Sequence, residues 1–145
     1  IAGKKIVENH YFMRLILQLD IFQKRKNFLK ATDRYKFFEA VKFFGSVIIS
    51  HQLENDLNYL YFDALYLDLP LIHNSERLKK YGYYYPRNNI EIAVENLKLV
   101  IDSHEENIND YRLKNKQLLN SFSVNNIQNQ KIYLDLINQV INIKD

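Results

Sequence analysis

Residues 46–75 read SVIISHQLENDLNYLYFDALYLDLPLIHNS, and this stretch decides the fold. It opens at residues 46–50 with a continuous, mostly β-branched run, which is typical of a strand buried on both faces. It closes at residues 69–74 with a second short apolar run. Between them, apolar residues recur at helical spacing and predict a helix over about residues 56–67. A strand, a helix and another strand in this order predict a βαβ unit, and therefore two parallel strands.

The same alternation of short strands and helices runs along the rest of the chain. Further strands are predicted at residues 1–2, 27–31 and 83–86. Further helices are predicted at about residues 8–19, 33–44, 75–82, 90–103, 105–122 and 126–143. Gly45 and Gly82 stand where a glycine ends a helix. The predicted fold class is α/β: a Rossmann-like parallel sheet with helices on both faces and a helical C-terminal extension.

The length of 145 residues suits one domain of ordinary size, and 47% apolar residues suffice for a core. We expect residues 1–105 to form the Rossmann-like domain, incomplete at its N-terminus because Ile1–Ala2 resemble the tail of a strand. Residues 106–145 are purely helical by pattern. They are expected to pack on that domain or to brace a neighbouring one that is missing here.

Composition excludes several classes of function. The net charge of +3 comes from scattered basic residues interleaved with acidic ones, which predicts no binding of nucleic acid. Cysteine is absent, so disulfides and thiolate metal sites are excluded, and a reducing, cytoplasmic location is expected. No apolar run approaches the roughly 20 residues of a membrane span. With three glycines, a glycine-rich phosphate loop is not available, so a phosphate site would need helix N-termini and side chains.

Polar side chains follow both strands of the opening stretch. The first strand leads from Ser50 into His51, Gln52, Glu54 and Asn55, and the second leads into His73, Asn74 and Ser75. Ligands of open parallel sheets bind beyond the carboxyl ends of the strands. If the two strands are neighbours, both groups of polar residues should therefore open on the same crevice.

The helix between the strands adds a second line of polar residues. Asn55, Tyr59 and Asp63 are spaced four apart, so they lie along one stripe. Asn55 or Asp56 is placed to cap the helix, which would direct free amides of the first turn toward an anion in the crevice. Asp63 lies two turns along, roughly 10 Å from the helix start. That distance matches the reach of a nucleoside diphosphate from its phosphates to its ribose diol, which a carboxylate can accept.

Simpler interpretations stay open for several of these residues. Asp63 could be a solvent-facing helical residue, and residues 54–56 could do no more than cap a helix. His51 and His73 have no third ligand at recognisable spacing, so no metal site is predicted. They are expected to bond a phosphate or a sugar hydroxyl, or to cap strand ends. The tyrosines of residues 81–86 are expected to pack rather than to stack on a ligand.

The central segment resembles the donor-binding segment of two-domain (GT-B type) glycosyltransferases. There a serine and an acidic residue follow a buried strand, a helix carries a second acidic residue before alanine, and a G-x-P turn follows. The counterparts here are Ser50 and Glu54, then Asp63-Ala64, then Asp68-Leu69-Pro70. The segment is closer still to an uncharacterised, glycosyltransferase-like bacterial family whose version has tryptophan where Leu53 stands. The resemblance covers most of residues 1–105.

Two departures from the glycosyltransferase pattern concern residues of the site. The two acidic residues of the family are usually eight positions apart, whereas Glu54 and Asp63 are nine apart; Asn55 and Asp63 are eight apart. The register of the first acidic residue is therefore open. Asp68 stands in place of the glycine of G-x-P. The basic pair that neutralises the leaving diphosphate in many such enzymes lies upstream of this chain or is absent.

The resemblance implies an enzyme that moves a sugar from a nucleoside diphosphate sugar to an acceptor held by the missing N-terminal domain. This chain would be the donor-binding half, inactive alone, with no cofactor; catalytic residues stay unknown. Rival readings are a nucleotide- or phosphosugar-binding module without transferase activity, and a non-catalytic interaction domain. The expected donor-binding residues are Ser50, His51, Glu54, Asn55, Asn58, Tyr59, Asp63, His73, Asn74 and Ser75.

Overall fold

The computed structural model describes residues 8–24, 35–45 and 47–142. The chain divides into two compact units, residues 1–43 and residues 44–145. The predicted strands at residues 1–2 and 27–31 lie outside the described residues.

The first unit is helical in the residues that the structure describes. Helix α1 (His10–Gln18) begins at Asn9, whose side chain accepts a hydrogen bond from the Phe12 amide over 3.0 Å. This capping confirms the helix predicted over residues 8–19. A short helix α2 (Asp20–Lys24) follows and was not predicted. Helix α3 (Phe37–Phe44) forms inside the predicted range of 33–44 and ends at Gly45, which has φ 115°.

The second unit contains the sheet, built from the segments that the sequence predicts as strands. Its strands are β1 (Ile48–Ser50), β2 (Leu71–His73) and β3 (Tyr83–Tyr84). All pair in parallel, in the order β1-β2-β3, with Ser50 beside His73 and His73 beside Tyr84. All three strands therefore end at the same edge. The helices of this unit are α4 (Tyr59–Tyr66), α5 (Ile90–Ser103), α6 (Ile108–Ser121) and α7 (Ile127–Asn142).

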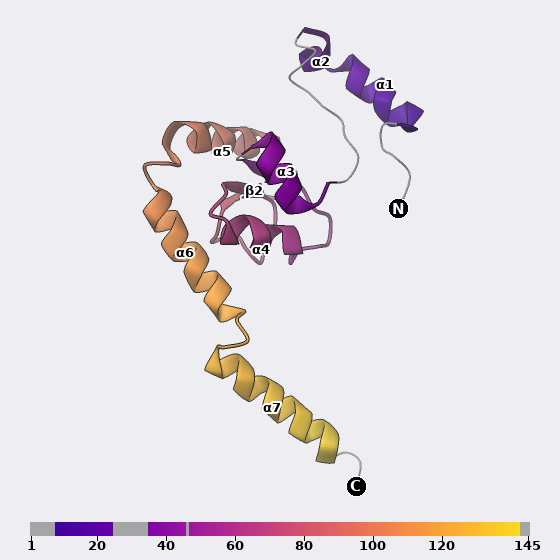
Figure 1. Cartoon of the computed structure of the whole chain (residues 1–145). Coiled ribbons are helices and arrows are strands. Elements are labelled where there is room, and N and C mark those ends of the chain that lie inside the picture. Colours follow the sequence, from indigo (N-terminus) through magenta and orange to yellow (C-terminus); the bar gives the residue numbers. More distant parts are fainter. Residues whose placement is uncertain (1–7, 25–34, 46, 143–145) are drawn as a thin grey trace. The chain divides into compact units, whose positions relative to one another are not determined.

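Helices cover both faces of the central strand β2, as predicted. Side chains alternate across a strand, so Ile72 points to the opposite face from its neighbour His73. Ile72 packs in one cluster with Val100 of α5. The His73 ring contacts the ring of Tyr61 from α4, with centroids 5.3 Å apart. Figure 1 shows α4 and α5 on opposite sides of β2. The fold is the expected α/β architecture, with all of β2 buried.

Two predicted helices of this unit are wrong in part. The helix expected over residues 56–67 begins only at Tyr59, because Asn58 is its N-cap: the Asn58 side chain accepts from the Leu60 amide over 3.0 Å. The capping role expected for Asn55 or Asp56 is thus corrected. Residues 75–82, expected to be a short helix, form successive turns instead. Their buried anchor is Leu78, which is 1% exposed.

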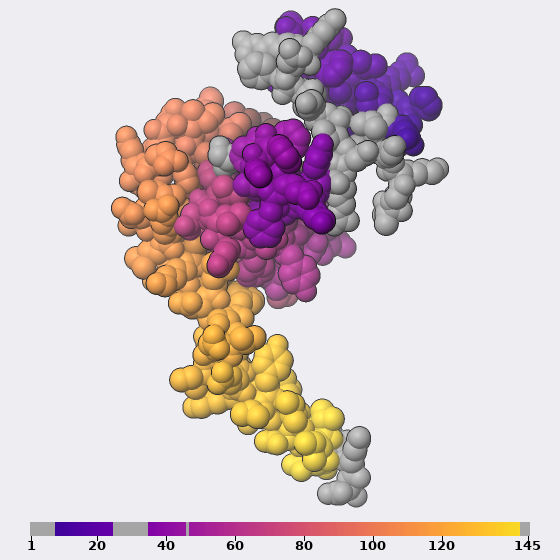
Figure 2. Space-filling view, viewed as in Figure 1, coloured from indigo at the N-terminus to yellow at the C-terminus, as the bar shows by residue number. Residues whose placement is uncertain are grey.

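The C-terminal helices follow their predicted ranges, and α5 matches at both ends. Helix α6 is fastened to the start of β2 by Tyr111. The Tyr111 hydroxyl donates to the Leu69 carbonyl over 2.8 Å and accepts from the Leu71 amide over 3.2 Å. Helix α7 has no buried residue, and Figure 2 shows its side chains, in yellow, uncovered on the visible face. The assignment of residues 106–145 to a brace stays a prediction. None of the helices in the described ranges is both long and apolar enough to cross a membrane.

We predict that Gly82→Ala destabilises the fold strongly. Gly82 has φ 62°, and an added Cβ would lie 2.7 Å from the Leu71 carbonyl oxygen and 3.1 Å from the His73 ring. Left-handed strain and overpacking together should lower the free energy of unfolding by about 2–4 kcal/mol, as measured by urea denaturation. Gly45→Ala is the matched control, since Gly45 has φ 115° but nothing within 4 Å of the added Cβ. An unchanged free energy of unfolding in Gly82→Ala would contradict the close approach at Gly82.

Candidate functional site

A cavity of about 360 Å³ opens at the edge where the strands end. Of the polar residues predicted at the strand ends, Gln52 and Glu54 after β1 and Asn74 after β2 line this one cavity, and Arg87 after β3 joins them. The polar lining residues are Gln52, Glu54, Asp56, Asn74, Glu76 and Arg87.

The loops after β1 and β2 are joined by a reciprocal pair of hydrogen bonds. The Gln52 amide donates to Asn74 Oδ1, and Asn74 Nδ2 donates to the Gln52 carbonyl, each over 2.8 Å. Asn74 is 7% exposed, so its amide group has little access to water. Both of its polar atoms serve the neighbouring main chain, which makes Asn74 a support of the cavity wall.

Ser75 fixes the same loop at a second point. Its hydroxyl donates to the Asp56 carbonyl over 2.7 Å. Glu54 lies between the two fixed points with φ 56°, a left-handed conformation that non-glycine residues seldom adopt. Glu54 lines the cavity, whereas Asn55 is exposed and outside the lining. Both side chains are exposed, and the choice between Glu54 and Asn55 as the counterpart of the first acidic residue stays a prediction.

His73 is completely buried, and both ring nitrogens already have partners. Nε2 lies 2.8 Å from the Tyr81 carbonyl, which can only accept, so Nε2 carries the proton. Nδ1 accepts from the Ser75 amide over 3.1 Å. Burial lowers the pKa of His73, and the bond to the Tyr81 carbonyl opposes that shift in part. His73 is therefore held neutral and has no ring nitrogen left for a ligand.

Two further predicted residues, the buried Ser50 and the exposed His51, follow or end β1 and have partners of their own. Ser50, which is 9% exposed, accepts a hydrogen bond from Gln52 Nε2 over 3.2 Å. The Tyr61 hydroxyl is buried close to Ser50, and among the described residues it has no partner in hydrogen-bonding geometry. His51 is exposed; its Nδ1 lies 3.0 Å from the Tyr85 hydroxyl, and the two rings stack. These contacts bring the ends of β1 and β3 together around the central strand.

The predicted residues on α4 lie away from this cavity. Asn58 uses its side chain to cap the helix, and Tyr59 is 87% exposed. Asp63 is partly buried in the middle of α4 and is not part of the cavity lining. A role for Asp63 in binding a ribose stays a prediction.

The sequence reasoning missed Arg87 and Glu76. Arg87 follows β3 and has φ 23°, which is unusual for a residue with a side chain. The sequence could have indicated Arg87. Residues 83–86 are predicted to be a strand, and a residue that follows a third parallel strand should reach the same edge of the sheet. Glu76 accepts a hydrogen bond from the Tyr84 hydroxyl. That bond, more than burial, raises the pKa of Tyr84 to about 12.

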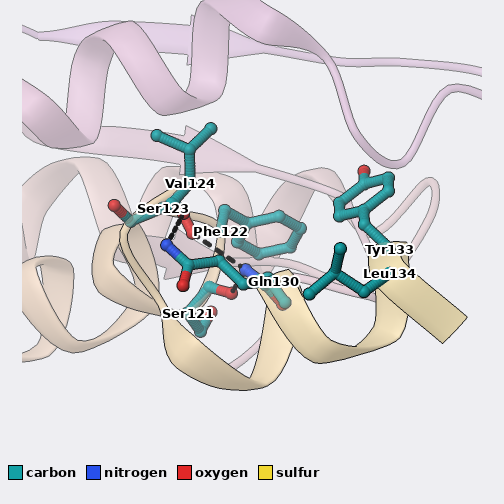
Figure 3. A pocket seen from close by; sticks show the side chains of 8 residues that line it. Ser121, Phe122, Ser123, Val124, Gln130, Tyr133 and Leu134 are labelled. Carbon is teal, nitrogen blue, oxygen red and sulfur yellow. Dashed lines mark hydrogen bonds between the residues drawn. The ribbon is translucent and has the colours of Figure 1, made fainter.

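A larger cavity, of about 570 Å³, lies at the turn between α6 and α7. Figure 3 shows Phe122, Tyr133 and Leu134 around it, while Gln130 donates to the Val124 carbonyl over 3.0 Å. Its lining is mainly apolar, and the amide side chains of Asn129 and Gln130 hold the turn together. Over residues 8–24, 35–45 and 47–142, no three potential metal ligands of the His, Cys, Asp or Glu type are grouped together.

Comparison with known proteins assigns the chain to a family. The family model DUF2827, described as a protein of unknown function, matches residues 1–137. The chain belongs to the DUF2827 family. No curated protein and no solved structure matches it significantly. The DUF2827 match spans the sheet, the cavity and most of α7, so the site described above lies inside the family domain.

For this DUF2827 chain we predict a loss of stability in mild acid that depends on His73. Because the folded pKa of His73 is lowered, the unfolded chain binds the proton more readily. The stabilisation is complete above about pH 6.5 and is lost as the pH falls below that value, by at most about 1.4 kcal/mol per pH unit. Urea denaturation from pH 8 to pH 5 should show this slope. His73→Gln should reduce the slope, whereas exposed His51→Gln should keep it; the reverse result would contradict the assignment.

We also predict that Asn74→Ala releases the loop after β1. Losing both hydrogen bonds to Gln52 should lower the free energy of unfolding by about 2–3 kcal/mol. Hydrogen exchange at the Gln52 amide should accelerate at the same time. Asn55→Ala, an exposed neighbour in the same loop, should change stability by less than about 0.5 kcal/mol. If the Gln52 amide exchanges at an unchanged rate in Asn74→Ala, the reciprocal pair does not hold the loop.

Proposed function

We propose that this chain is the donor-binding half of a glycosyltransferase that uses a nucleoside diphosphate sugar. The observation that carries the proposal is the cavity at the carboxyl ends of β1, β2 and β3. Open parallel sheets bind their ligands at this edge. The cavity size falls within the range of small-molecule sites.

The wall of the cavity is built in advance, which favours a ligand site over an open surface loop. Asn74 and Ser75 hold the main chain at Gln52 and Asp56, on either side of Glu54. A main chain that is already fixed loses little further freedom when a ligand binds. The Glu54 carboxylate can accept hydrogen bonds from a diol of the donor.

The turn after α4 also supports the resemblance to glycosyltransferases. Asp68 stands where those enzymes have the glycine of G-x-P, and its φ of 54° is one that glycine adopts without strain. Its carboxylate accepts from Arg112 Nε over 3.1 Å. The chain thus keeps the backbone conformation of a glycine turn while using an aspartate. This is a local likeness, and it concerns a position outside the cavity.

In the proposed reaction, the bond between the anomeric carbon and the diphosphate oxygen breaks, and that carbon bonds to an acceptor oxygen. The diphosphate leaves with the electron pair, and the acceptor hydroxyl loses its proton to a base. The acceptor and this base are assigned to a further domain. The contribution of this chain is to bind and orient the donor, with Arg87 near the developing negative charge.

We predict that the chain binds UDP, GDP or dTDP in a calorimetric titration. Arg87→Ala should weaken that binding by about tenfold, as expected for loss of a charged hydrogen bond. Asp63→Ala tests the expected ribose contact in the same titration. Lys98→Ala, an exposed residue of α5, removes one positive charge elsewhere and should leave the affinity unchanged.

The possible results separate the candidate functions. No binding of any of the three nucleotides would end the proposal in favour of a non-catalytic interaction domain. Binding that neither Arg87→Ala nor Asp63→Ala alters would place the nucleotide elsewhere on the chain. Transfer of sugar is to be sought with the full-length protein, since this half is expected to turn over nothing by itself.

A further inference from the structure

The cavity at the strand ends carries an uneven set of charges. Three carboxylates line it, from Glu54, Asp56 and Glu76, against one guanidinium from Arg87. The formal charge of the lining is therefore −2. Within the part of the chain that the structure describes, Arg87 forms no ion pair that would remove it from the cavity.

This charge decides which part of a donor the cavity can hold. A diphosphate bears at least two negative charges, which the three carboxylates would repel at close range. Hydroxyl groups are neutral and donate hydrogen bonds, which suits a wall of carboxylates. The diphosphate is better placed at the rim of the cavity, beside the exposed Arg87 and outside the carboxylate wall.

We propose that this cavity holds the sugar of the donor and selects a neutral sugar against a uronic acid. This inference rests on the proposed function and adds the substrate class. A neutral hexose and its uronate differ only in a terminal hydroxymethyl or carboxylate group. The carboxylate of the uronate would meet a net charge of −2, whereas the hydroxymethyl group would gain hydrogen bonds.

The expected discrimination follows from Coulomb's law. If the carboxylate of the uronate lies roughly 6 Å from the lining charges in water, each unit of net lining charge changes the affinity for the uronate by about threefold. A lining charge of −2 should therefore favour the neutral sugar by about tenfold. The preference should weaken at high salt, because the groups are partly exposed.

The experiment compares two donors that share one nucleotide. UDP-glucose is titrated against UDP-glucuronate, dTDP-glucose against dTDP-glucuronate, and GDP-mannose against GDP-mannuronate, using the nucleotide that binds. The neutral donor should bind about tenfold more tightly. Glu54→Gln or Glu76→Gln should reduce that ratio to about threefold, and Arg87→Gln should raise it to about thirtyfold.

Glu106→Gln is the matched control. It removes one negative charge from an exposed residue that is separated from the cavity by the length of α5, about 21 Å at 1.5 Å per residue. The ratio of affinities should not change. If a nucleotide binds but both sugars bind equally, or the uronate binds better, this inference falls and the proposed function stands. If no nucleotide binds, both fall.

Discussion

Two hydrogen bonds to the His73 ring hold the centre of the structure together. The buried imidazole donates a hydrogen bond from Nε2 to the Tyr81 carbonyl, and its Nδ1 accepts a hydrogen bond from the Ser75 amide. These bonds draw residues 81–82 against β2 so closely that only a glycine fits at position 82. From that approach the chain enters β3, and the third strand completes the edge at which the cavity lies.

The cavity depends on pairs of residues that are distant in sequence. Asn74 and Ser75 leave the end of β2 and bind the main chain of the loop after β1 at two points. These hydrogen bonds keep the loop out of the helical conformation. Helix α4 therefore begins only after Asn58, its N-cap. The position of Glu54 in the wall is a result of this arrangement. Burial of polar groups is tolerated here because nearly every one has a partner.

The sequence predicted those features that depend on local pattern. The apolar runs of β1 and β2 and the period of α5 were readable because burial imposes them residue by residue. The start of α4 could not be read from local pattern. Hydrogen bonds between residues 19 and 22 positions apart in the sequence compete with helix formation there. The turns at residues 75–82 were missed for the same reason, since Ser75 bonds to the Asp56 carbonyl. Arg87 could have been predicted from the parallel sheet, whereas the left-handed φ of Glu54 has no local signal.

The hydrogen bonds of the Tyr111 hydroxyl link the folding of β2 to the synthesis of α6. Pro70 has no N–H, so the main chain at the start of β2 lacks one donor. The Tyr111 hydroxyl bonds to the residues on either side of that proline, from 40 and 42 positions further along the chain. The central strand can thus assemble its last polar contacts only after α6 has left the ribosome. Until then the Leu69 carbonyl and the Leu71 amide lack the partner that Tyr111 supplies.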